Sequence, residues 1–190
     1  MARKNVFDKE KILSKAKDYL MKNDIETLNA RSLCSYIGCS TQPLFKYFAN
    51  MSELKSKLKD YLHDYYNSFV EQRLNKEDYL YSISNAYATF SFENPNLFKA
   101  LFMSDLAGTR TISEVLLSAQ NQETIAFIED TYNFSKKQAN ELYRDTRFYV
   151  HGLSCQIATN SISVSQKEIS FLIENIITKL KEGIINENNH

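Results

Sequence analysis

Glycine and proline are scarce in this chain, which has four glycines and two prolines among its 190 residues. These residue types supply the backbone angles of tight turns, and a β-sandwich or barrel needs many such turns. Helices need far fewer. No stretch of the sequence shows a convincing run of apolar and polar residues alternating with period two, so we expect an all-α fold.

Apolar residues recur at helical spacing and predict about nine helices. Their expected ranges are residues 8–23, 30–37, 40–47, 50–74, 77–93, 95–104, 109–131, 136–160 and 166–184. Side chains suited to capping open six of them, namely Asp8, Asn29, Ser40, Asn50, Ser135 and Ser165. Gly38 is suited to end the second helix.

The length fits one domain, or a small domain joined to a larger one, and needs no disulfide or metal to hold a core. We expect a cytoplasmic protein, because the first ten residues contain no apolar run of the signal-peptide type. The longest uncharged stretch, residues 148–166, is too polar to cross a membrane. Cys34, Cys39 and Cys155 show no ligand-like spacing, so we expect buried thiols, no metal site and no cofactor.

Residues 30–47 have the proportions of a helix-turn-helix, since two short helices flank about three residues that include Gly38. The second helix of such a pair enters the major groove of DNA. The charge agrees with this function: residues 1–59 hold 12 Lys and Arg against 6 Asp and Glu, a net of +6, and the other 131 residues carry −6. The zero net charge therefore hides a basic end suited to double-stranded DNA.

Residues 29–48, followed by Asn-Met-Ser-Glu-Leu at 50–54, resemble the DNA-binding region of the tetracycline-repressor (TetR) family of bacterial regulators. That family combines a capped second helix, a Gly-Val-Ser turn, an aromatic-rich recognition helix ending near Tyr-x-Phe and a Lys-x-x-Leu start of the fourth helix. Residues 92–98 and 148–153 resemble its ligand-binding domain, especially in the Trp-His-Gly subgroup, with Phe148 or Tyr149 in place of Trp.

The resemblance implies two domains: a three-helix, helix-turn-helix DNA-binding domain at 1–50, and a helical ligand-binding and dimerisation domain at 51–190. It also implies a ligand-responsive transcriptional regulator, most often a repressor, that has no catalytic residues and binds a near-palindromic operator as a homodimer.

The recognition helix supplies most of the expected DNA contacts, which are Thr41, Gln42, Pro43, Phe45, Lys46 and Tyr47. Gln42 can pair with adenine, and Lys46 can reach guanine or a phosphate. The resemblance implies that Arg31 also reaches DNA. Met51 stands where the family commonly has a phosphate-contacting Lys, so that contact is lost or passes to Lys55. Behind these residues we expect a core of Leu33, Ile37, Leu44 and Phe48.

The last predicted helix carries an apolar stripe broader than one neighbouring helix would cover: Ile169, Leu172, Ile173, Ile176, Ile177 and Leu180. With Leu153 and Ile157 of the preceding helix it would suit a two-fold, four-helix interface. The resemblance implies a homodimer built through these two helices. Core packing within one chain is the alternative explanation of the stripe.

Residues 61–102 hold 11 of the 24 aromatic residues, whose phenolic tips in an apolar lining would suit a planar or amphipathic small ligand. The expected contacts of this unknown effector are Tyr65, Phe69, Tyr87, Phe102, Phe127 and His151. Aromatic residues that simply fill the core would explain the same composition.

Two other functions stay open. One is a TetR-like protein that acts through protein partners with weakened DNA binding, which Met51 favours. The other is a small-molecule-processing enzyme that uses His151 and Cys155, four residues apart on one helical face.

Overall fold

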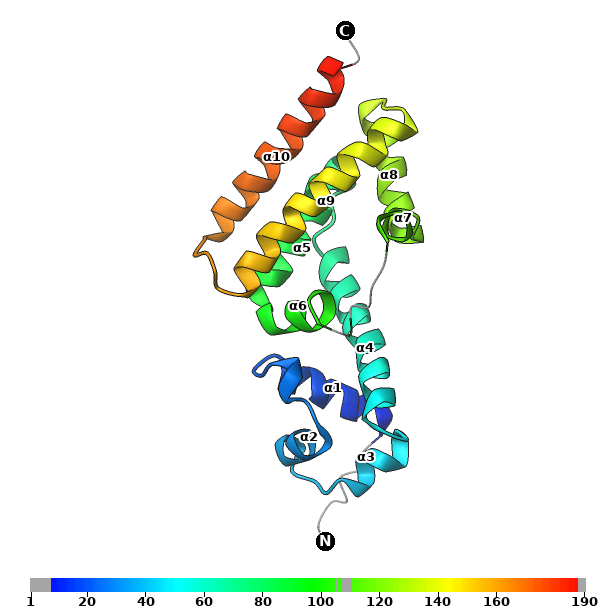
Figure 1. The fold of residues 1–190 in the computed structure, drawn as a ribbon, viewed down its shortest axis with the longest axis vertical. Coiled ribbons are helices and arrows are strands. Elements are labelled where there is room, and N and C mark those ends of the chain that lie inside the picture. The colour runs from blue at the N-terminus through cyan, green and yellow to red at the C-terminus, as the bar shows by residue number, and fades with distance from the viewer. Residues whose placement is uncertain (1–7, 105, 107–110, 188–190) are drawn as a thin grey trace. The chain divides into compact units, whose positions relative to one another are not determined.

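The computed structural model describes residues 8–104, 106 and 111–187, and every regular element among them is helical (Figure 1). The all-α prediction is confirmed. The helices are α1 (Lys9–Leu20), α2 (Ala30–Ile37), α3 (Gln42–Tyr47), α4 (Met51–Glu71), α5 (Tyr79–Glu93), α6 (Pro95–Phe102), α7 (Ile112–Leu116), α8 (Ala119–Tyr132), α9 (Lys136–Ala158) and α10 (Gln166–Glu187). Two short 3-10 turns, Ile25–Thr27 and Lys76–Asp78, complete them. None of these helices is long and apolar enough to cross a membrane.

Five of the six predicted caps accept a hydrogen bond from a backbone N–H of the helix that follows: Asp8, Asn29, Asn50, Ser135 and Ser165. The prediction for Ser40 is wrong, because Thr41 precedes α3 and its hydroxyl makes no capping bond. Pro43 lies in the first turn of α3 and has no N–H. A capping side chain would accept a hydrogen bond from an N–H in this turn, and the N–H at position 43 is missing.

The predicted helix at 109–131 is two helices in the structure, α7 and α8, and residues 109 and 110 lie outside the described part. Ser118 has extended backbone angles and precedes α8, which interrupts the helical hydrogen bonding. The side-chain amide of Gln122 donates to the carbonyl of Leu116 at 2.8 Å and so satisfies an acceptor at the end of α7.

The chain divides into two compact units, residues up to 67 with 94–108, and residues 68–93 with those from 109 onwards. The first unit therefore contains most of α4 and all of α6 in addition to α1–α3. The last turn of α4 belongs to the second unit, so this helix contributes residues to both. The functional division into residues 1–50 and 51–190 stays a prediction.

In the first unit, α1 packs against α2 and α6. Its core side chains include Ile12, Ala16, Leu20, Leu33, Leu44, Phe48, Leu54 and Leu58, each at most 2% exposed. An ion pair adds to the contact with α6, since Lys99 Nζ lies 2.9 Å from Asp24 Oδ1 in the segment after α1.

In the second unit, α5 packs most extensively against α9, and both helices also contact α8 and α10. The buried side of α5 is made largely of small residues, namely Ser82, Ser84, Ala86, Ala88, Thr89 and Ser91. Large apolar side chains from α8, α9 and α10 complete the core. Small residues let helices approach closely, which explains the dense contact between α5 and α9.

Candidate functional site

The turn between α2 and α3 fixes the geometry of the helix-turn-helix. Gly38 has a left-handed conformation with φ 79°, which ends α2 as predicted. The carbonyl of Cys34 accepts hydrogen bonds from the N–H groups of Gly38 at 2.9 Å and of Cys39 at 3.0 Å. The start of α2 is held by a capping box, in which Ser32 N–H donates to Asn29 Oδ1 and Asn29 N–H donates to Ser32 Oγ, both at 3.0 Å.

Two buried side chains anchor the predicted recognition helix α3. Leu44 is 2% exposed and Phe48, just after the helix, is 1% exposed, and both belong to the core of the first unit together with Leu33. The core predicted for these three residues is confirmed, whereas Ile37 is only partly buried. A six-residue helix is too short to be stable alone in water, so this burial determines where α3 lies.

The opposite side of α3 is open to solvent. Thr41, Gln42, Phe45 and Lys46 are all exposed, and their positions at i, i+1, i+4 and i+5 place them on one helical face. Phe45 is 46% exposed although it directly follows the buried Leu44. The structure thus brings together four of the six recognition-helix residues that the sequence predicted for DNA contact.

The other predicted DNA contacts are less exposed or lie apart from this face. Pro43 is partly buried, and so is Tyr47, whose ring centroid lies 5.6 Å from Lys46 Nζ. Arg31 is exposed on α2. Lys55 is partly buried on α4. Tyr47 directly precedes the core residue Phe48, so packing explains part of its burial.

The start of α4 carries the carboxylate of Glu53. Glu53 Oε2 accepts the N–H of Ala49 at 2.7 Å, and the N–H of Glu53 donates to Asn50 Oδ1 at 2.9 Å. The predicted cap Asn50 is thus confirmed, while the carboxylate of Glu53 binds the N–H of Ala49 and not that of Asn50. The two bonds also place a carboxylate at the start of α4, beside Met51, where the resemblance implies a phosphate contact.

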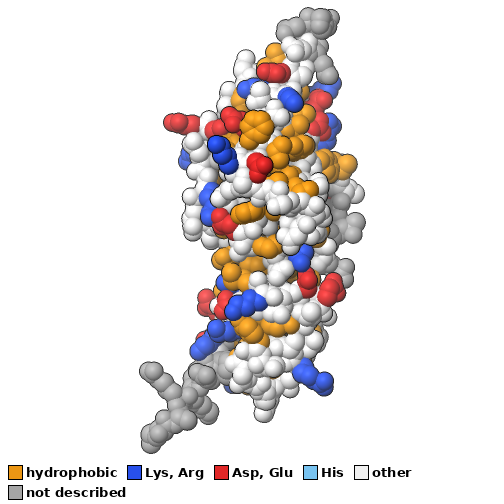
Figure 2. Space-filling model, turned by 90° about the vertical axis from the view of Figure 1, so that its left-hand side faces the viewer, with side chains coloured by type: hydrophobic (Ala, Val, Ile, Leu, Met, Phe, Trp, Pro, Cys, Tyr) orange, Lys and Arg blue, Asp and Glu red, His pale blue; other side chains and the backbone are white. Residues whose placement is uncertain are grey.

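Lysines of α1 supply much of the local positive charge, and some of them are already engaged. Lys15 and Lys17 lie 3.4 Å and 3.2 Å from the carboxylate of Asp18. Lys11 and Lys22 are exposed. Figure 2 shows several Lys and Arg side chains on the visible face of the first unit.

In the second unit the structure brings together Tyr87 of α5 and His151 of α9, two of the predicted effector contacts. The Tyr87 hydroxyl lies 2.8 Å from His151 Nδ1, and Cys155 Sγ lies 3.5 Å from His151 Nε2. Burial, followed by the charge of Arg147, lowers the pKa of His151. Burial raises the pKa of the Cys155 thiol.

These pKa directions describe a neutral imidazole beside a protonated thiol. Nucleophilic catalysis by cysteine needs the opposite, a thiolate stabilised by a neighbouring cation. The arrangement of His151 and Cys155 therefore does not activate the thiol. Among the described residues, no group of three or more His, Cys, Asp or Glu side chains could hold a metal ion.

The other predicted effector residues are engaged in separate aromatic contacts. In the first unit, Tyr65 lies under the ammonium of Lys17, 4.8 Å from its ring centroid, and Phe102 packs edge-on against Tyr66. In the second unit, Phe69 is buried against Phe90, with ring centroids 5.2 Å apart. Core filling, the alternative explanation of the aromatic residues, accounts for Phe69, whereas Tyr65 and Phe102 are only partly buried.

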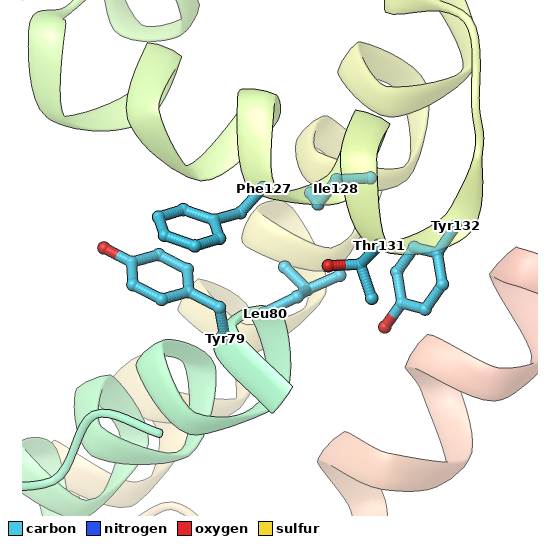
Figure 3. A pocket seen from close by; sticks show the side chains of 6 residues that line it. All are labelled: Tyr79, Leu80, Phe127, Ile128, Thr131 and Tyr132. Carbon is cyan, nitrogen blue, oxygen red and sulfur yellow. The ribbon is translucent and has the colours of Figure 1, made fainter. Parts of the chain in front are cut away.

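Phe127 lines a small open pocket between α5 and α8 (Figure 3). Its ring stacks on Tyr79 with centroids 4.3 Å apart and ring planes 10° apart. The pocket measures about 180 Å³ including the part open to solvent, and its walls are Tyr79, Leu80, Phe127, Ile128, Thr131 and Tyr132. Sites for drug-sized ligands measure roughly 300–1,000 Å³, so this pocket is too small to be the predicted effector cavity.

The predicted dimer residues lie mostly inside the chain's own core. Five of them are buried there, namely Leu153, Ile157, Ile169, Ile173 and Ile177, and Leu172, Ile176 and Leu180 are partly buried against the same core. The stripe is broad because α10 packs on both α5 and α9 of its own chain. The alternative, core packing within one chain, therefore accounts for it.

Other apolar residues of the same two helices are exposed. Phe148 is 52% and Tyr149 39% exposed on α9, and Phe171 is 65% and Ile185 43% exposed on α10. Figure 2 shows apolar side chains gathered on the visible face of the second unit. Sequence reasoning missed Phe171 and Ile185 because they lie off the regular stripe. The only sign of an exposed apolar surface was that both side chains are large and apolar.

No family model matches the chain, and no curated protein matches it. Solved structures resemble it, and two of them do so over nearly their whole length. A TetR variant from Acinetobacter baumannii AYE in complex with minocycline is 16% identical, with a TM-score of 0.59 over 95% of this chain and 98% of that one. AibR in complex with isovaleryl coenzyme A and operator DNA is 12% identical, with a TM-score of 0.57 over 89% of this chain and 95% of that one. The chain therefore has the all-helical fold of TetR-family regulators.

Proposed function

We propose that this chain is a ligand-responsive DNA-binding transcription regulator, most simply a repressor, that acts in the cytoplasm. The observation that carries the proposal is the division of α3 into two faces. Leu44 and Phe48 fix the helix to the core, while Gln42, Phe45 and Lys46 point to solvent. The basic end of the chain and the shared fold with a structure that contains operator DNA support it.

In this proposal the exposed face of α3 reads base edges in the major groove. Gln42 pairs with an adenine, and Lys46 contacts a guanine or a phosphate. Phe45 offers an apolar surface to a thymine methyl, a role that Pro43 can share. Thr41 lies on the same face, while Arg31, Tyr47 and Lys55 around the helix contact the phosphate backbone and set the register.

We also propose that the protein is a homodimer that binds a near-palindromic site, with α9 and α10 of two copies forming a four-helix interface. The exposed residues Phe148, Tyr149, Phe171 and Ile185 carry this interface, in place of the buried stripe residues that the sequence indicated. Large exposed apolar side chains on neighbouring helices are typical of such surfaces.

The effector is proposed to be a planar or amphipathic small molecule that binds in the second unit beside Tyr87 and His151. These two residues offer a phenolic hydroxyl and a neutral ring nitrogen in a partly buried setting. The two neighbours bind small molecules in their solved structures, minocycline and isovaleryl coenzyme A. We place the chain with the Trp-His-Gly subgroup, with His151 as its histidine and Tyr149 or Phe148 in place of tryptophan.

Coupling between effector and DNA is assigned to α4, which contributes residues to both compact units. A ligand that binds one conformation of α4 more tightly shifts the population toward it and so changes the affinity for DNA.

The test is selection of binding sites from a pool of random DNA duplexes by the purified full-length protein. We expect enrichment of a near-palindrome whose half-sites lie about one helical turn apart. Scrambled duplexes of the same composition should bind more weakly at every salt concentration. Equal affinity for selected and scrambled duplexes would contradict the proposal.

A second candidate function is action through a protein partner with weakened DNA binding. The carboxylate of Glu53 at the start of α4, beside Met51, favours it, because both features oppose phosphate binding there. Failure of the selection experiment to enrich any sequence would favour this candidate.

A further inference from the structure

Cys34 and Cys39 flank the turn of the helix-turn-helix, and the backbone holds them close together. The N–H of Cys39 donates to the carbonyl of Cys34 at 3.0 Å across the left-handed Gly38. Standard bond lengths then limit the distance between their Cα atoms to about 7 Å even if the connecting path were straight, and the hydrogen-bond geometry bends it. Disulfides span Cα distances of about 4.4–6.8 Å, so this pair is within reach of one.

The two side chains also face each other. At a helix end with a left-handed glycine, the residue after the glycine commonly packs its side chain against a residue in the last turn of the helix. Cys39 and Cys34 occupy these two positions. Burial, followed by the neighbouring charge of Cys39 and a side-chain hydrogen bond with it, raises the pKa of Cys34 to about 11. Both thiols are free, and neither takes part in the DNA contacts proposed above.

The thiols differ in their access to solvent. Cys34 is 3% exposed, whereas Cys39 is partly exposed. A small oxidant therefore reaches Cys39 first, and Cys34 is the buried partner that can complete a disulfide. The third cysteine, Cys155, lies in the second unit.

We propose that Cys34 and Cys39 are a redox modification site, at which hydrogen peroxide closes an intrachain disulfide that weakens DNA binding. The thiolate sulfur of Cys39 attacks a peroxide oxygen, the O–O bond breaks, and a sulfenic acid and hydroxide form; the hydroxide takes up the proton that Cys39 released and leaves as one water. The sulfur of Cys34 then attacks the sulfenic sulfur, the S–O bond breaks, and hydroxide leaves as a second water with the proton of Cys34. Two thiols are oxidised by two electrons, and one peroxide is reduced to two waters.

Closure changes the segment that leads into α3. Two sulfurs in contact must approach to a bond length of about 2 Å. Cys34 lies on α2, which the Asn29 capping box and the buried Leu33 hold in place, so Cys39 has to move. Only two residues separate Cys39 from Gln42, the first residue of α3. The movement of Cys39 therefore shifts the exposed face of α3, which must be placed accurately in the major groove of DNA.

The site is tested first by mass spectrometry on the full-length protein, before and after treatment with hydrogen peroxide. Cleavage after Arg31 and Lys46 leaves both cysteines in one peptide, residues 32–46, and places Cys155 in another, residues 148–167. We expect residues 32–46 to lose two hydrogens and to resist alkylation until a reductant is added. Oxidation that instead links Cys155, or that stops at sulfinic acid on Cys39, would overturn the proposal.

The effect on DNA rests on the proposed function and is measured separately, with the duplex enriched by the selection experiment. Peroxide should lower the affinity of the wild-type protein by about tenfold or more, the effect of losing one base contact, and a reductant should restore it. Cys39→Val and Cys34→Ala should bind as the reduced wild type does and should not respond to peroxide.

An unchanged affinity of the disulfide form would overturn the regulatory part of the proposal. If the reduced protein binds no duplex, the DNA-binding function fails together with that part. The mass of residues 32–46 by itself decides whether the disulfide forms.

Discussion

Three buried hydroxyl groups in the second unit have no hydrogen-bond partner among the described residues: Thr89 Oγ1 on α5, and Thr146 Oγ1 and Ser154 Oγ on α9. Thr89 is 1% exposed, so its hydroxyl has lost the hydrogen bonds that water offers in the unfolded chain. We expect Thr89→Val to stabilise the protein. Valine keeps the branched shape and nearly the same helix propensity, and it replaces the hydroxyl by a methyl group.

The magnitude follows from the cost of an unsatisfied buried group. A buried donor or acceptor without a partner costs about 1–3 kcal/mol, and valine removes this cost. For a protein of this length, 1 kcal/mol corresponds to a rise of about 2–4 °C in Tm. Thr146→Val should act in the same direction, since Thr146 is also 1% exposed.

Urea and thermal unfolding of the wild type and the variants measure the effect, and Thr124→Val is the matched control. Thr124 is 0% exposed, like the test sites, but its side chain is hydrogen-bonded to Tyr79. The same substitution should therefore lower the Tm at position 124 and raise it at position 89. Destabilisation at both positions would refute the reasoning, because it would show that the Thr89 hydroxyl is paired in solution.

Three further results are expected. Gln42→Ala should lower the preference for one or two base pairs of the selected duplex by about 1–3 kcal/mol. Binding titrations against single-base variants of the duplex measure this preference. An unchanged preference would show that Gln42 does not contact these bases. Phe171→Glu should leave the fold intact by circular dichroism, because Phe171 is 65% exposed, and should give a monomer in sedimentation; a stable dimer would contradict the proposed interface. His151→Phe should flatten the acid side of the stability profile. Burial and then Arg147 lower the folded pKa of His151, so its contribution is complete above the unfolded pKa of about 6.5 and is lost as pH falls through the folded pKa. Equal slopes for both proteins in Tm against pH would count against this origin.

The helix class and most helix starts could be predicted because they depend on local chemistry. Asn29, for example, needs only Ser32 three residues later to form its capping box. The division at Ser118 could not, because a serine inside an apolar run carries no signal that separates a cap from an ordinary helical position. Its outcome depends on how α7 and α8 pack.

The exposed face of α3 could be predicted for a similar reason. Leu44 and Phe48 lie four residues apart, so one helical turn decides which side of α3 is buried. How much of the α10 stripe is left for a partner could not be predicted, because the sequence does not show how many helices of the same chain will cover it. Ile173 is buried by two such neighbours, whereas Phe171, two residues away, is exposed. Effector residues depend on contacts between distant segments, as between Tyr87 and His151, 64 residues apart.

The two-sided construction of α3 has a consequence for how such a protein can diversify. The residues that hold the helix, Leu44 and Phe48, are separate from those that face outwards. Substitutions at Gln42, Phe45 and Lys46 therefore change the presented chemistry while they cost little stability. Under the proposed function, a gene duplicate could acquire a new target sequence by a few such exchanges and keep its scaffold unaltered.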